Sequence, residues 1–210
     1  VTGVQTCALP IFNQADFIQR LKNQTTFNIN KVVSPKNYIR IDDIDLQLTQ
    51  GESADIVYTH QKVVLMDWHA DWNKAKAIAA TASPACCQAD QDKMTQFFAA
   101  VGVHVIWTKD HPGLYVMRSI AMLVNEACEA VLHDVATEHD IDVAMRFGVN
   151  YPQGPFEWMT QIGTQQILMI LENLHQVYGE ERYRPSLYLR KKVATLALPV
   201  QQAQQLKQAG

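Results

Sequence analysis

The hydrophobic pattern of this chain changes its period once, close to Thr108, and this change limits the fold more than any other feature. Before it, apolar residues alternate with polar ones or gather in short runs rich in β-branched residues, which is typical of strands. After it, apolar residues recur every three or four positions, which is typical of helices. The sequence therefore predicts an α/β part followed by an all-α part.

The first part carries four strand candidates and one clear helix candidate. The strand candidates are residues 39–48, 63–68, 75–81 and 103–108, and the helix candidate is residues 90–101. A second, shorter helix is expected within residues 51–61. Because strands alternate with helices, we expect a small, mostly parallel α/β layer over residues 38–110.

Five helices are expected in the second part, over residues 111–195. The first is long, and its apolar residues share one face between Leu114 and Leu132. The others cover residues 137–148, 155–162, 164–178 and 186–193. Thr137 and Thr164 are the expected N-caps, and Gly148 is expected to take a left-handed conformation where its helix ends. The polar tail, residues 196–210, is expected to fray.

Charge and cysteine spacing exclude several classes of function. Eighteen basic and 21 acidic residues give a net charge of −3, so we expect no nucleic-acid partner. No apolar run approaches the roughly 18 residues that a membrane span needs. The four cysteines, Cys7, Cys86, Cys87 and Cys128, lack the spacing of a zinc site, so we expect no metal. Together these features indicate a soluble, cytoplasmic protein with reduced thiols.

The beginning of the chain does not look like part of a fold. Residues 1–11 resemble a translated sequencing-library adapter, and we exclude them from the fold prediction. An adapter there implies that the natural reading frame continues upstream, so we expect the chain to be a fragment. Residues 12–37, rich in Asn, Gln and Thr, are predicted as a linker.

A long motif in the helical half carries a family resemblance. The pattern D-x-A-M-x-x-G-x-x-x-P-x-G-P is matched by Asp142, Ala144, Met145, Gly148, Pro152, Gly154 and Pro155. This motif resembles that of the C-terminal domain of the 3-hydroxyacyl-CoA dehydrogenases. The similarity is greatest to the two-module members that oxidise 3-hydroxyadipyl-CoA in phenylacetate breakdown. It implies a reduced Rossmann-like layer followed by a helical domain similar to the C-terminal domain of 6-phosphogluconate dehydrogenase.

The resemblance also indicates what the chain lacks. Oxidation of a 3-hydroxyl by NAD requires a dinucleotide cradle, typically G-x-G-x-x-G, and no two of the nine glycines here lie two positions apart. The family's catalytic His and Glu belong to its full Rossmann domain, and no segment here matches theirs. The catalytic modules place an Asn where this chain has Met117, which cannot hydrogen-bond as an amide does. We therefore expect no catalytic and no cofactor-binding residue here, with NAD bound by an upstream domain.

The remaining candidates are substrate-side or interface residues, namely Met117, Asn150, Pro152, Gly154 and Pro155. The last four form a predicted rigid elbow between two helices, where Gly154 is expected to adopt a conformation barred to other residues. Asp140 and Asp142 are expected to stabilise the first turn of the preceding helix. That the elbow lines an acyl or CoA groove stays open as an alternative to a purely structural role.

Other polar and aromatic residues receive structural interpretations. His69, between Asp67 and Asp71, is interpreted as a polar loop residue rather than a general base. Glu126 is predicted to be partly buried and to hydrogen-bond another helix. The four tryptophans are assigned to packing.

Two hypotheses of different classes follow. In the first, the chain is the C-terminal half of an NAD-dependent 3-hydroxyacyl-CoA dehydrogenase, shares the acyl-CoA substrate with the upstream module, and is inactive alone. In the second, it is a non-enzymatic dimerisation or acyl-CoA-binding module. A homodimer through the helical domain is compatible with both, and the sequence leaves open whether the long helix pairs with the helical domain of the upstream module or with a second subunit.

Overall fold

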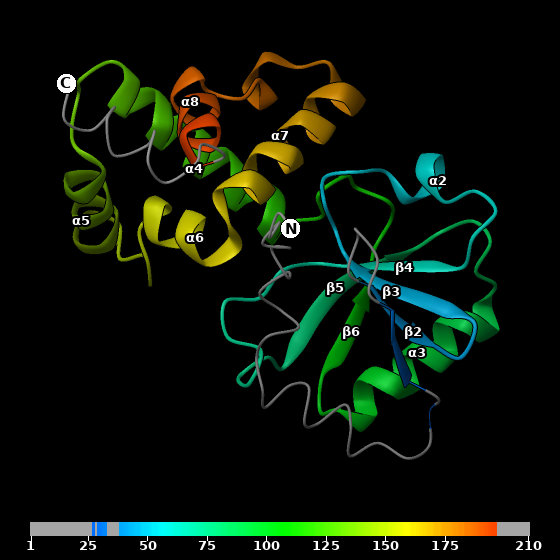
Figure 1. Ribbon diagram of the computed structural model, residues 1–210. Coiled ribbons are helices and arrows are strands. Elements are labelled where there is room, and N and C mark those ends of the chain that lie inside the picture. The colour runs from blue at the N-terminus through cyan, green and yellow to red at the C-terminus, as the bar shows by residue number, and fades with distance from the viewer. Residues whose placement is uncertain (1–26, 28, 33–37, 197–210) are drawn as a thin grey trace, which may run out of the picture. The chain divides into compact units, whose positions relative to one another are not determined.

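The computed structural model describes residue 27, residues 29–32 and residues 38–196 (Figure 1). The chain divides into two compact units between Arg118 and Ser119. Residues 1–11, most of the predicted linker and nearly all of the predicted tail lie outside the described residues. The prediction of an α/β layer followed by a helical domain is confirmed.

Unit 1, up to Arg118, contains one six-stranded sheet in the order β1-β2-β3-β4-β5-β6. Its strands are β1 (Ile29–Val32), β2 (Tyr38–Ile41), β3 (Ile44–Leu48), β4 (Val63–Met66), β5 (Ala77–Ala82) and β6 (His104–Trp107). β1 lies within the segment that the sequence predicted as a linker. It pairs with β2 from Ile29 opposite Ile41 to Val32 opposite Tyr38.

The expectation of a mostly parallel sheet is wrong. β3–β4 and β5–β6 are parallel, whereas β1–β2, β2–β3 and β4–β5 are antiparallel. The reason lies in the connections, because a parallel pair needs a long crossover and an antiparallel pair can use a tight turn. Residues 39–48, predicted as one strand, form a hairpin that turns at Asp42 (φ 53°) and Asp43. The two parallel pairs are connected through helices α2 (Ala54–Val57) and α3 (Gln88–Ala100).

The core of unit 1 follows from the period-two pattern. Ile39 and Ile41 of β2 pair with Leu46 and Ile44 of β3, and all four side chains are buried. Helix α3 buries Met94, Phe97 and Phe98 completely. Apolar burial of this size, about 1.5–3 kcal/mol for each large side chain, is the main source of stability for the layer.

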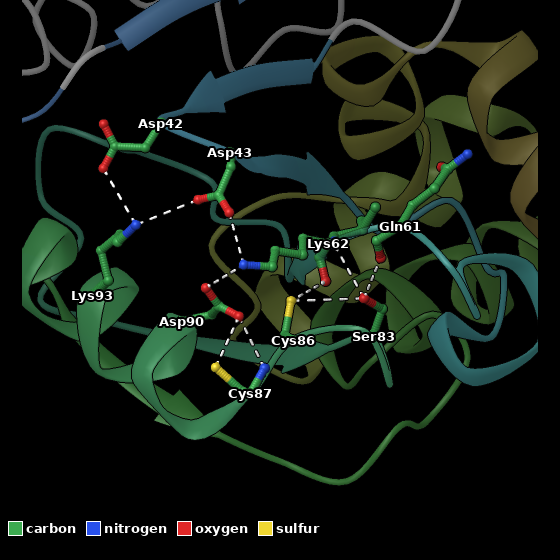
Figure 2. Close-up of polar contacts among 10 residues, drawn as sticks. Asp42, Asp43, Gln61, Lys62, Ser83, Cys86, Cys87, Asp90 and Lys93 are labelled. Atoms are coloured by element: carbon green, nitrogen blue, oxygen red, sulfur yellow. Dashed lines mark hydrogen bonds and ion pairs between the residues drawn. The ribbon is translucent and has the colours of Figure 1, made fainter.

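A charged network fastens the β2–β3 turn to the rest of unit 1 (Figure 2). Lys62 Nζ lies 2.7 Å from Asp43 Oδ2 in the turn and 3.0 Å from Asp90 Oδ1 in α3. Lys93, also in α3, reaches Asp42 and Asp43 at 3.5 and 3.4 Å. Because Lys62 bridges two carboxylates, the pKa of Asp43 is lowered and the pKa of Lys62 is raised.

Unit 2 is helical, as predicted. Its helices are α4 (Val116–Leu132), which starts in unit 1, and α5 (Glu138–Gly148), α6 (Pro155–Ile162), α7 (Thr164–Tyr178) and α8 (Leu187–Leu196), with a 3-10 turn at Glu181–Tyr183. The apolar face of α4 is buried at Ile120, Ala121, Val124 and Cys128. No helix in the described part of the chain is long and apolar enough to cross a membrane.

Of the three residues predicted at helix ends, Thr137 is confirmed, whereas Gly148 and Thr164 differ from the prediction. Thr137 does cap α5, since its Oγ1 accepts a hydrogen bond from the Asp140 N–H at 3.2 Å. Gly148, however, does not adopt the left-handed conformation, and Asn150 does so instead, with φ 59°. Thr164 is the first residue of α7 rather than its cap, because Gly163 (φ 108°) already makes the turn that separates α6 from α7.

Candidate functional site

The elbow between α5 and α6 is held by a side chain from the middle of α5. Asp142 Oδ1 accepts a hydrogen bond from the Phe156 N–H at 2.8 Å, so it caps α6 rather than its own helix as the sequence suggested. Glu157 Oε2 accepts from the Gly154 N–H at 2.8 Å and completes a capping arrangement. Burial raises the pKa of the Asp142 carboxyl, and the hydrogen bond from Phe156 acts against this.

Gly154 is required at the elbow for space and not for its backbone angles. Its φ is −80°, which any residue adopts, so the expectation of an unusual conformation is wrong. A Cβ built on Gly154 would lie 2.5 Å from the Cα of Asp142, and closer still to Cγ and Oδ1 of that residue. The α5 backbone therefore passes so near to Gly154 that no side chain fits.

The other elbow candidates differ in exposure. Pro155 is buried as the first residue of α6, where its missing N–H leaves no hydrogen bond unmade. Asn150 and Pro152 are exposed. Pro152 lines a shallow cavity of about 500 Å³ with Arg146, Gln153, Glu157 and Thr160. This surface lies in unit 2, whereas Met117 lies in unit 1, so the candidates do not form one site within either unit.

Met117 is a buried residue near the start of α4. Its side chain is 1% exposed, and its backbone N–H donates to Asp67 Oδ1 at 2.9 Å. The side chain is therefore packed in the protein interior, and the prediction of Met117 as a substrate-side or interface residue stays a prediction.

The sequence missed one buried polar residue in unit 2. Asn125, 3% exposed, donates from Nδ2 to the Arg184 carbonyl at 2.9 Å and accepts from the Ser186 N–H at 2.8 Å. It thereby ties α4 to the chain that leads into α8. The prediction of a partly buried Glu126 is wrong by one position, because Glu126 is exposed. A polar residue amid an apolar run was the available signal, and the helical phase decides which of two neighbours is buried.

The described residues do not fit a dinucleotide. In nucleotide-binding folds the pyrophosphate meets free N–H groups at a helix N-terminus that follows a strand. At the start of α3, the Cys87 N–H and thiol donate to Asp90 Oδ2 at 2.9 and 3.2 Å (Figure 2). At α2, Asp110 Oδ2 accepts from the Ser53 hydroxyl and the Asp55 N–H. A pyrophosphate at either place would meet a carboxylate of the protein.

The remaining residues support their structural interpretations. His69 Nδ1 accepts a hydrogen bond from the Asp71 N–H at 3.0 Å within the loop after β4. Trp68, Trp72 and Trp158 are buried. Cys128 is buried too, and burial raises its pKa to about 12, as expected of an unreactive thiol. Among the described residues no group of three or more His, Cys, Asp or Glu side chains could hold a metal ion.

Comparison with known proteins agrees with this geometry. A family model described as "3-hydroxybutyryl-CoA dehydrogenase reduced Rossmann-fold domain" matches residues 46–112. A second, "3-hydroxyacyl-CoA dehydrogenase, C-terminal domain", matches residues 113–207, directly after the first. The chain belongs to the 3-hydroxyacyl-CoA dehydrogenase family. The first model begins within β3 and covers α2, β4, β5, α3 and β6, whereas β1 and β2 precede it. The second covers the helical domain, including the Asp142–Gly154 elbow.

Three relatives show the extent of the similarity. The 3-hydroxyadipyl-CoA dehydrogenase of Escherichia coli is 42% identical over 154 residues, which cover 72% of this chain and 32% of the relative. A probable 3-hydroxybutyryl-CoA dehydrogenase of Deinococcus radiodurans is 37% identical over 100 residues, 48% of this chain and 36% of the relative. The crystal structure of a 3-hydroxybutyryl-CoA dehydrogenase from E. coli matches with a TM-score of 0.72 and 38% identity, covering 80% of this chain and 34% of that one. The chain thus spans about a third of the length of these relatives.

Proposed function

We propose that this chain is the C-terminal, non-catalytic half of an NAD-dependent 3-hydroxyacyl-CoA dehydrogenase, which oxidises a 3-hydroxyacyl-CoA to a 3-oxoacyl-CoA. The observation that carries the proposal is the order of the two matched domains. A reduced Rossmann layer leads directly into the helical domain, and the match to the E. coli 3-hydroxyadipyl-CoA dehydrogenase runs across both.

Within such an enzyme the hydride acceptor and the catalytic residues belong to another domain. NAD would be bound upstream, because this chain has no G-x-G-x-x-G fingerprint and its helix starts in unit 1 are occupied by carboxylates. The chain contributes shape, the acyl-CoA side of the cleft or subunit contacts. The elbow residues Asn150 and Pro152, which are exposed, are the candidates for a contact with the acyl-CoA.

The substrate proposed is a dicarboxylic 3-hydroxyacyl-CoA, as formed in phenylacetate breakdown in the cytoplasm. This choice follows the name of the 42% identical relative. A fatty 3-hydroxyacyl-CoA of β-oxidation is the alternative substrate. The two are distinguished by comparing kcat/KM for 3-hydroxyadipyl-CoA and 3-hydroxybutyryl-CoA once the upstream domain is joined to the chain.

Activity and binding assays on the 210-residue chain test the proposal directly. We expect no NADH formation with either 3-hydroxyacyl-CoA and no NADH binding by fluorescence titration. Turnover by this chain would refute the assignment of NAD and the catalytic residues to another domain. If the gene region upstream of this chain encoded no dinucleotide fingerprint, the proposal that an upstream domain binds NAD would also be refuted.

A second candidate function, a dimerisation module, is favoured by one feature of unit 2. The expectation of a dimer through the long helix needs revision, because the apolar face of α4 is already buried, whereas α5 has no buried residue. Its apolar side chains Val143 and Phe147 are 39% and 79% exposed, and Val149 after it is 55% exposed. An uncovered apolar face of this kind marks an association surface.

Light scattering in solution tests this surface. We expect a dimer for the natural chain and a monomer for Phe147→Glu, because a charge at the centre of an apolar contact opposes association. The matched control is Val135→Glu, which adds the same charge at a site 74% exposed but outside α5. A monomeric natural chain, or equal effects of the two substitutions, would contradict the dimerisation hypothesis.

A further inference from the structure

Asp67 holds the first turn of α4 with its buried carboxylate. The residue follows β4 directly and is 1% exposed. Its Oδ2 accepts hydrogen bonds from the N–H groups of Tyr115 and Val116 at 2.9 and 2.8 Å. Its Oδ1 accepts from the N–H groups of Met117 and Trp68 at 2.9 and 2.8 Å. Three successive N–H groups of one helix start thus converge on one carboxylate.

This arrangement is the one in which helices bind anionic ligands. The first N–H groups of a helix have no partner within the helix, and the helix dipole favours negative charge beside them. Phosphate and carboxylate groups of ligands commonly occupy this place. Here the anion is a side chain of the same unit, about 50 residues away along the chain. Burial raises the pKa of the Asp67 carboxyl, and the N–H donors act in the opposite direction.

The other two helix starts described in unit 1 also carry a carboxylate, each with fewer backbone N–H donors. Asp90, in the first turn of α3, accepts from the Cys87 N–H and thiol, and Asp110 accepts from the Asp55 N–H and the Ser53 hydroxyl at the start of α2. All three helix starts in unit 1 that the structure describes therefore receive a carboxylate from unit 1 itself.

We propose that carboxylates of unit 1 itself occupy its helix N-termini. Asp67, at the start of α4, takes the position in which a carboxylate or phosphate of a ligand would otherwise bind. Unit 1 is thereby closed to dinucleotides, and α4 begins without a ligand. The inference deepens the proposed function, since it rests on the assignment of NAD to another domain and gives the physical reason why unit 1 cannot take it.

Chemical rescue of Asp67→Ala tests the proposal. The variant lacks the carboxylate but keeps the three N–H groups, so formate should enter the vacated space. At 100 mM formate, matched against chloride at equal ionic strength, we expect the Tm of Asp67→Ala to rise by roughly 3 °C, given a site of about 10 mM affinity. The natural chain and Asp71→Ala should each rise by less than about 1 °C. Asp71 is the matched control, because it lies in the same loop with a side chain 40% exposed.

Hydrogen exchange supplies a second measurement in case Asp67→Ala does not fold. Asp67→Asn keeps the shape of the side chain but replaces one accepting oxygen with a donor. We expect at least tenfold faster exchange of the Tyr115, Val116 and Met117 amides than in the natural chain. Unchanged exchange in Asp67→Asn, or a folded Asp67→Ala that formate does not stabilise beyond the control, would overturn the proposal.

Different results would refute this inference and the proposed function. Stabilisation of the natural chain by NADH would overturn both this inference and the proposed function. Absence of formate rescue, with no NADH binding by the natural chain, would overturn only the role assigned to Asp67.

Discussion

Replacement of Gly154 by alanine is the sharpest test of the elbow. The new Cβ would lie 2.5 Å from the Cα of Asp142, and since this is a backbone atom, rotation of a side chain cannot relieve the contact. Either α5 moves away from α6 or the Asp142–Phe156 hydrogen bond is lost, and both changes cost stability.

The magnitude follows from two separate costs. Overpacking of a close contact costs about 1–3 kcal/mol, and loss of the cap on α6 costs about 0.5–2 kcal/mol. We expect Gly154→Ala to lower the free energy of unfolding by about 1–5 kcal/mol, the upper end applying if both costs arise, measured by urea denaturation followed by circular dichroism.

Gly148 provides the matched control, because it belongs to the same motif but a Cβ at this position would have no atom within 4 Å, and its φ is not positive. Gly148→Ala should change stability by at most about 1 kcal/mol, in the stabilising direction, since alanine restricts the unfolded chain. Adding Asp142→Ala to Gly154→Ala should recover only part of the loss, because the contact with the Asp142 backbone remains. Equal effects of the two glycine substitutions would refute the close-approach explanation.

Two further predictions concern one site in each unit. Asn125→Ala should lower the free energy of unfolding by about 1–3 kcal/mol, because it removes the partner of the buried Ser186 N–H and of the part-buried Arg184 carbonyl. Glu126→Ala, at the exposed neighbouring position, should change the urea midpoint little. In unit 1, Lys62→Met should lower the free energy of unfolding at pH 6. The difference between this variant and the natural chain should become smaller as the pH falls. For Asp43 the hydrogen bond with Lys62 lowers the pKa, and for Asp90 burial, which alone would raise it, is outweighed by hydrogen bonds from Lys62 and Cys87. Carboxyls with lowered folded pKa values stabilise the fold above their unfolded pKa, near 4, and lose that contribution below it. A difference that stays constant in urea denaturation from pH 6 to pH 2.5 would contradict this role for Lys62.

The predictable part of the fold is the part that local pattern determines. β4, β5, β6 and α3 lie where the period of the apolar residues placed them, because burial of one face imposes that period on each element. Strand direction was not predictable in the same way. The hairpin within residues 39–48 depends on a two-residue turn at Asp42 and Asp43, and its only mark in the sequence is that this polar pair shifts the alternation by one residue.

The motif contained the elbow residues but not their roles. It included both Asp142 and Gly154 as separate members, and the close approach of the two depends on a contact across 12 residues of chain. Asp67 appeared only as a neighbour of His69, and its role depends on groups 48 to 50 residues away. Neither periodicity nor spacing contains such information.

The sequence alone determined the two-part architecture, the family and the missing dinucleotide fingerprint, because these depend on residue type and on distances along the chain. Only the tertiary structure decided that helix starts in unit 1 are occupied by Asp67, Asp90 and Asp110, and that Gly154 is needed for space. The physical reason is that a helix start offers its N–H groups to any anion within reach. Which anion arrives there is set by folding in three dimensions and not by the residues beside it.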